Sequence, residues 1–151
     1  MKKTMLRTLP AGVLLLTIPF AAMAETAWFT MISPTLRIDA VDPLDPHEFV
    51  FAVTDADTIQ ALRNIVLDLP DAAHTRRIEG RIVRGRAAYN PAWNFHLDPS
   101  SIRMQSNSTE ICDASAFLIE DEIEKVGTDF LPDGQWCPWT MRVLREVKLA
   151  P

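Results

Sequence analysis

The run from Tyr89 to Pro99 constrains the fold more than any other part of this 151-residue chain. Within it, apolar and polar side chains alternate in the order Trp93, Asn94, Phe95, His96, Leu97 and Asp98. A period of two predicts a β-strand that buries one face and exposes the other. Pro91 and Pro99 bound the run, as expected of residues that cannot donate a hydrogen bond to a strand ladder. We therefore expect a strand whose apolar side anchors the core and whose polar side carries His96 and Asp98 together.

The first 24 residues have the pattern of a secretory signal peptide rather than of folded structure. A head with three Lys or Arg side chains precedes an apolar run from Ala11 to Ala22, and residues 22–24, Ala-Met-Ala, form a small-residue cleavage site. The apolar run is too short to span a bilayer. We expect export to a bacterial periplasm or to the medium, with no membrane span left after processing.

Processing at this site would leave 127 residues with 12 Lys and Arg against 20 Asp and Glu, a net charge of −8. This length suits one domain. The acidity disfavours binding to nucleic acid or to an anionic membrane. We expect residues 25–48 to form an extended lead-in with at most one edge strand, and residues 49–151 to form a single domain.

Cys112 and Cys137 are the two cysteines of the chain. In an oxidising compartment, such a pair favours one intramolecular disulfide. The bond would close a loop of about 26 residues and stabilise the fold by roughly 3.5 kcal/mol in the chain-entropy model.

The periodicity elsewhere predicts an α+β fold. An apolar strand at 49–53 leads into a helix capped by Thr54, and residues 77–83 form a half-exposed strand in which Gly80 indicates a bulge or a close approach. A second helix begins at Asp113 and ends before Gly127, and residues 141–147 form the last strand. The order is β-α-β-β-β-α-β. We expect an antiparallel sheet of about four to six strands with two helices on one face and one disulfide.

A cluster of basic side chains follows the strand at 77–83. It consists of Arg76, Arg77, Arg81, Arg84 and Arg86. We interpret it as a solvated strand face offset by neighbouring carboxylates, because surface charge runs usually do no more than solvate. The alternative is a patch for an anion or a partner.

Candidate catalytic residues are His96, Asp98 and Glu110, with Asp113 nearby. If the junction around Cys112 lies over the central strand, these groups could converge for acid–base work or for binding a divalent metal. However, Asp98 before Pro99 is a natural turn residue and Asp113 a natural helix cap. The motifs of metalloproteases, serine hydrolases and nucleotide-binding proteins are absent from the sequence. We therefore expect no metal and no cofactor, and catalysis is the weaker alternative.

Candidate binding residues are Trp93, His96, Trp136 and Trp139. Tryptophans are favoured anchors of interfaces, so these side chains could line a groove for a peptide, an amphipathic helix or a sugar. Burial in the core is the competing interpretation, since large aromatic side chains dominate cores. A third possibility is a protease-inhibitor-like loop at Trp136–Trp139, held by the disulfide.

Several runs of the sequence resemble a known family. They are Phe49 to Asp55, Tyr89-Asn90-Pro91 with Trp93 and Phe95-His96-Leu97-Asp98-Pro99, Glu110-Ile111-Cys112-Asp113-Ala114, Phe130-Leu131-Pro132, Trp136-Cys137-Pro138-Trp139 and Arg145-Glu146-Val147. The chain resembles small secreted bacterial proteins related to the N-terminal domain of an amoebal calmodulin-binding protein. The resemblance covers Phe49 to Val147 and leaves the lead-in outside. It implies a binding domain, whereas a calmodulin target would need a basic amphipathic helix and both helices predicted here are acidic or mixed.

Together these observations predict an exported, monomeric binding or interaction domain. Its ligand is expected to be a protein, a peptide or a small molecule. A small hydrolase-like enzyme that uses His96 with Asp98 or Glu110, and the inhibitor-like loop, are the alternatives.

Overall fold

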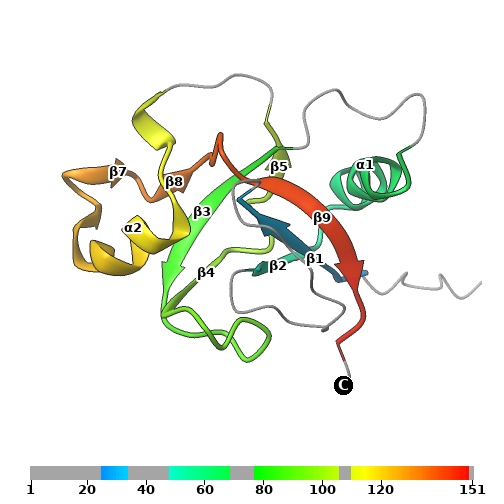
Figure 1. Cartoon of the computed structure of the whole chain (residues 1–151), viewed down its shortest axis with the longest axis horizontal. Helices are drawn as coiled ribbons and strands as arrows, with labels where there is room; N and C mark the ends of the chain where they lie inside the picture. The colour runs from blue at the N-terminus through cyan, green and yellow to red at the C-terminus, as the bar shows by residue number, and fades with distance from the viewer. Residues whose placement is uncertain (1–24, 34–47, 69–76, 106–109, 150–151) are drawn as a thin grey trace, which may run out of the picture.

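The computed structural model describes residues 25–33, 48–68, 77–105 and 110–149. Its elements, shown in Figure 1, are β1 (Ala27–Ile32), β2 (Phe49–Val53), α1 (Ala56–Val66), β3 (Ile78–Arg84), β4 (Phe95–Leu97), β5 (Arg103–Met104), η1 (Glu110–Cys112), α2 (Ala116–Asp121), η2 (Ile123–Lys125), β6 (Val126–Gly127), β7 (Phe130–Pro132), β8 (Gln135–Trp136) and β9 (Arg142–Val147). Mixed helices and antiparallel strands confirm the predicted α+β class. Among the described residues, no helix is long and apolar enough to cross a membrane.

The first sheet contains three antiparallel strands in the order β2-β1-β9. We predicted at most an edge strand in the lead-in, and this was wrong because β1 has a partner on both sides. Phe29 of β1 lies opposite Phe51 of β2 and opposite Glu146 of β9. Thr30 is as completely buried as Phe29, so both faces of β1 are covered. A strand covered on both faces shows no alternation, which is why its residues show little sign of it.

The second sheet is built around β3. The carbonyl oxygen of Arg81 accepts a hydrogen bond from Asp98 N (2.9 Å), whereas Ile82 N donates to the carbonyl of Gly134 (2.8 Å). Adjacent residues of β3 therefore bond to opposite neighbours, with β4 and β5 along one edge and β8 along the other. The predicted single sheet is thus two sheets, accompanied by a short parallel pair, β6 and β7.

Aromatic side chains join the two sheets. The ring of Phe49 on β2 lies 5.0 Å from that of Phe95 on β4 and 5.2 Å from that of Trp136 on β8, measured between centroids. Gly80 of β3 allows this close packing, since a Cβ there would meet Ile102 Cδ1 at 3.3 Å. The predicted close approach at Gly80 is confirmed. Trp93, Phe95 and Leu97, the expected core anchors, are all buried.

Both helices begin one or two residues later than predicted. Asp55, not Thr54, caps α1 by accepting from Thr58 N (3.0 Å) and Thr58 Oγ1 (2.6 Å), which lowers the pKa of its carboxyl group. Ser115, not Asp113, caps α2 by accepting from Leu118 N (3.1 Å). We expected both helices on one face, whereas Figure 1 shows α1 beside β9 and α2 toward the opposite end of the molecule.

Ion pairs close the first sheet and offset the arginine cluster. Glu48, buried just before β2, pairs with Arg145 of β9 at 2.7 Å. Of the arginines near β3, Arg81 pairs with Asp98 (2.6 Å) and Arg84 with Glu124 (3.3 Å). Neighbouring carboxylates therefore offset these two charges, as predicted.

Candidate functional site

A disulfide links Cys112 of η1 to Cys137, which directly follows β8, as predicted. The Cα atoms of the two cysteines are 5.3 Å apart. Cys137 N also donates to the carbonyl of Cys112 at 2.8 Å. The covalent bond and the backbone hydrogen bond together hold η1, and with it the start of α2, against the second sheet.

Trp136, a predicted binding residue, is completely buried. Its Nε1 donates to the carbonyl of Ala114 at 2.9 Å, and its ring meets the rings of Phe49 and Phe95 edge to face. Trp136 is therefore a core residue that fastens β8 to the segment leading into α2.

Trp139 is half-buried, at the end of the disulfide-linked segment. Its backbone N–H donates to Asp113 Oδ1 at 2.9 Å, so the carboxylate predicted to cap a helix binds this loop instead. Cys137 and Pro138 are buried. A loop that inhibits a protease must offer its side chains to the enzyme, and most of this one faces the core.

Trp93 is also buried, but it lines a hollow at the surface. The hollow measures about 290 Å³, counting solvent at its mouth. We refer to it as the Trp93 hollow; its lining residues are Ser33, Trp93, Ser115, Ala116, Phe117, Thr140 and Met141. The lining is apolar in the middle, with three hydroxyl groups among the remaining side chains. It brings together the chain before β4, α2 and the chain before β9, which lie far apart in the sequence.

Three large apolar side chains project to solvent beside this region. Ile111, Phe117 and Leu118 are 70%, 52% and 46% exposed, and we refer to them as the η1–α2 patch. The ring of Phe117 also packs on Trp93, with 5.1 Å between centroids in an edge contact. Phe117 therefore belongs both to the hollow and to the exposed patch.

His96 lies on β4 as predicted, and its side chain is half-buried. Its Nδ1 lies 2.8 Å from the carbonyl oxygen of Gly85, and Tyr89 meets the imidazole edge to face at 6.5 Å between centroids. The hydrogen bond to Gly85 fixes the ring on the turn between β3 and β4. This arrangement orients the imidazole toward backbone rather than toward a carboxylate.

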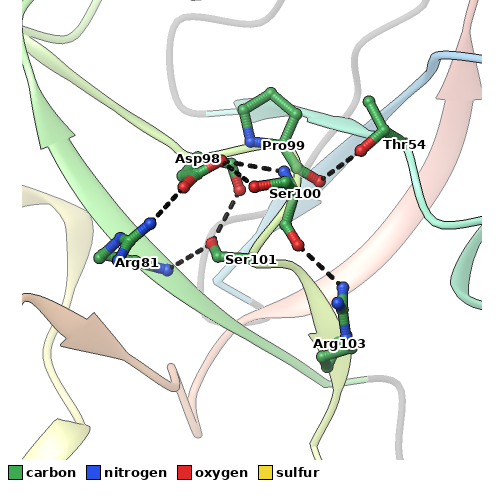
Figure 2. A network of polar contacts seen from close by, with 7 residues as sticks. All are labelled: Thr54, Arg81, Asp98, Pro99, Ser100, Ser101 and Arg103. Carbon is green, nitrogen blue, oxygen red and sulfur yellow. Dashed lines mark hydrogen bonds and ion pairs between the residues drawn. The ribbon is translucent and has the colours of Figure 1, made fainter.

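Asp98 has a different set of partners, shown in Figure 2. Its Oδ2 accepts from Arg81 Nη2 (2.6 Å), and its Oδ1 accepts from Ser100 N (3.0 Å) and Ser100 Oγ (2.7 Å). The Arg81 bond, followed by the Ser100 bonds, lowers the pKa of this carboxyl group. The neighbouring Pro99 carbonyl accepts from Thr54 N and Thr54 Oγ1, each at 3.3 Å. Asp98 thus organises the turn that joins β4 to β5 and braces it against β3 and the start of α1.

The catalytic candidates do not form an assembled site. His96 and Asp98 share a strand face in the sequence pattern, yet each is hydrogen-bonded to a separate turn. Glu110 begins η1, and its side chain lies outside the part of the chain that the structure describes. Within the described ranges, no group of three or more His, Cys, Asp or Glu is placed to hold a metal ion.

The fold and the surface define a class of protein: a disulfide-linked α+β domain with exposed apolar side chains beside a small hollow. The sequence model of a family of calmodulin-binding-protein N-terminal domains matches residues 34–150, and the chain therefore belongs to this family. The match confirms the resemblance, but it begins well before Phe49, so excluding the whole lead-in was wrong. No curated protein and no solved structure matches the chain.

Sequence reasoning did not single out Phe117, Leu118 or Met141 as surface residues. The helical period contains part of the signal, because Ile119 is completely buried and residues one or two positions away must point elsewhere. The contribution of Met141 could not have been found this way, since only the tertiary fold brings it next to α2.

Proposed function

We propose that this protein is an exported binding domain that contacts a protein or peptide partner through the η1–α2 patch and the Trp93 hollow. The observation that carries the proposal is the exposure of three large apolar side chains within eight residues, at 46–70% each. Singly exposed apolar residues are ordinary, whereas a group beside a hollow is typical of an interaction surface.

Phe117 has the properties of an interface anchor. It is aromatic, about half of its surface faces solvent, and its contact with Trp93 restricts its rotamers. Aromatic side chains that lose little freedom on binding dominate interface energetics. The disulfide adds to this preorganisation, because it fixes the segment that precedes α2.

A protein partner also agrees with the family, which is that of a calmodulin-binding protein's N-terminal domain. Export is supported by the signal-peptide pattern of residues 1–24 and by the disulfide, because disulfides persist in oxidising compartments. A periplasmic or secreted location follows for the processed chain.

The test compares Phe117→Ser with Leu67→Ser. Leu67 is 67% exposed at the end of α1, so the control removes a large apolar side chain from the opposite end of the molecule. Proteins retained from the periplasm and the medium of the native cells are identified, produced separately and titrated by calorimetry. Burying the exposed half of a Phe is worth about 1–1.5 kcal/mol, so Phe117→Ser should weaken binding about tenfold.

Circular dichroism checks that both variants fold. Leu67→Ser should bind within about twofold of the unmodified protein. Equal affinities for the two variants would remove the η1–α2 patch from the interface and refute the proposal.

A further inference from the structure

We propose that the partner segment is basic: one of its apolar side chains enters the Trp93 hollow, and neighbouring Lys or Arg residues pair with Asp121 and Glu124. This inference rests on the proposed function and names the chemistry of its partner.

Acidic side chains follow the apolar patch directly along the chain. Residues 110–124 include six Asp or Glu and no Lys or Arg. Asp121 closes α2, four residues after Phe117 and three after Leu118. Residues three and four apart are neighbours on a helix surface, so one carboxylate lies a single turn from both apolar side chains.

Most carboxylates of this region already have partners. Glu120 accepts from Asn94 N at 2.9 Å and also from Asn94 Nδ2, Asp113 accepts from the Trp139 backbone, and Glu122 pairs with Lys125. These bonds use the charges that face the core or the neighbouring turns. They leave the solvent side of the region to other carboxylates.

Asp121 and Glu124 are those carboxylates. Asp121 is exposed and forms no ion pair within the described ranges. The Glu124 side chain is 87% exposed and meets Arg84 at 3.3 Å, a longer contact than those by which Arg63, Arg81 and Arg145 pair with their carboxylates. Both carboxylates can therefore accept a cation from a partner.

The cations near this surface are engaged elsewhere. Arg84 Nη2 also donates to the carbonyls of Glu124 (2.8 Å) and Val126 (3.0 Å), and Arg86 donates to Asn94 Oδ1 (3.0 Å). Together with Lys125 they make three positive charges against the five carboxylates of Asp113, Glu120, Asp121, Glu122 and Glu124. The local excess is negative, as is the whole chain at −5, so a basic segment is attracted on approach.

The hollow favours a peptide side chain over a separate small ligand. Pockets for drug-sized molecules run to about 300–1,000 Å³ of enclosed space. The Trp93 hollow has about 290 Å³ even when solvent at its mouth is counted. It suits a single apolar side chain whose backbone remains outside, near Asp121.

The experiment selects peptides without assuming a sequence. A phage library of random peptides is panned against the processed, disulfide-bonded protein, against Phe117→Ser and against Asp121→Lys. Asp57→Lys is the matched control, because Asp57 is an exposed aspartate on α1 and its replacement changes the net charge equally. Enriched peptides are synthesised and titrated, and the indole ¹H–¹⁵N resonance of Trp93 reports whether the hollow is occupied.

We expect enriched peptides to combine one aromatic or large aliphatic residue with at least two Lys or Arg. Their binding should shift the Trp93 resonance and weaken as salt rises, because exposed ion pairs are screened. Asp121→Lys should weaken binding about three- to tenfold, as expected for loss and reversal of one exposed pair, and Asp57→Lys by less than about twofold.

The outcomes separate the two proposals. Peptides that need Phe117 but lack excess basic residues, or that bind Asp121→Lys and Asp57→Lys equally, overturn the basic partner and leave the binding surface standing. Peptides that bind Phe117→Ser as well as the unmodified protein overturn the binding surface itself. A library that yields no binder overturns both.

Discussion

Trp136 and Trp139 provide a sharp test of how this fold is held together. The same substitution, Trp→Phe, is made at two positions three residues apart. Trp136 is completely buried, and its Nε1 donates to the carbonyl of Ala114 at 2.9 Å. Trp139 is half-buried, and its Nε1 has no hydrogen-bond partner among the described residues.

The expected cost differs for a physical reason. Trp136→Phe leaves the Ala114 carbonyl buried and unsatisfied, which costs about 1–3 kcal/mol. It also removes two ring carbons from the core, worth about 1.5 kcal/mol at roughly 0.8 kcal/mol per buried carbon. We expect a loss of about 3 kcal/mol in the free energy of unfolding, or roughly 10 °C in Tm for a domain of this size.

Trp139→Phe removes an N–H that has no acceptor among the described residues, together with carbon atoms that are partly solvated. Removing an unsatisfied donor costs nothing and offsets part of the lost packing, so we expect a change below about 1 kcal/mol.

Urea denaturation followed by far-UV circular dichroism measures both variants, because tryptophan fluorescence itself changes with the substitution. The denaturant slope should stay constant, which shows that stability alone has changed. Equal costs at the two positions, or a larger cost at Trp139, would refute the assignment of Trp136 as the fastening between β8 and the chain before α2.

Two further predictions concern the disulfide and acid stability. Replacing Cys112 and Cys137 together by Ala should lower the free energy of unfolding by about 3.5 kcal/mol in urea titrations, and the exported protein should contain no free thiol; two free thiols without reductant would contradict the disulfide. Arg81 lowers the pKa of Asp98 below its ordinary 3.8, so this contact stabilises the fold above that pH and is lost as the pH falls through the lower, folded-state pKa. Asp98→Asn should therefore be less stable than the unmodified protein at pH 7 and close to it in strong acid, measured by urea midpoints; a difference that does not change with pH would contradict the Arg81 contact.

The local patterns of the sequence predicted the elements that are amphipathic. The alternation from Trp93 to Leu97 predicted β4 and its buried side, and the helical spacing of Ile59, Leu62 and Ile65 predicted α1. Gly80 predicted a close approach correctly, because a missing side chain in a strand leaves room for a neighbour.

The same patterns did not reveal elements whose register depends on partners. β1 is covered on both faces, so its sequence has no period that identifies it as the middle strand. β8 contains two residues, and a segment that short has no periodicity of its own. Both strands form because their backbones complete ladders started by other strands.

For the candidate site, the sequence determined which chemical groups are present, and the tertiary structure decided which of them meet. The residue types and the compartment were sufficient to predict the Cys112–Cys137 bond. The sequence pattern placed His96 and Asp98 on one face, but the chain around each supplied closer partners, Gly85 and Arg81. Likewise, three tryptophans were expected at a surface, whereas folding buried Trp136 in the core, set Trp93 beneath a hollow and left Phe117 exposed. A sequence records the polarity and size of each side chain, but exposure depends on what other segments cover, and only the packed fold determines that.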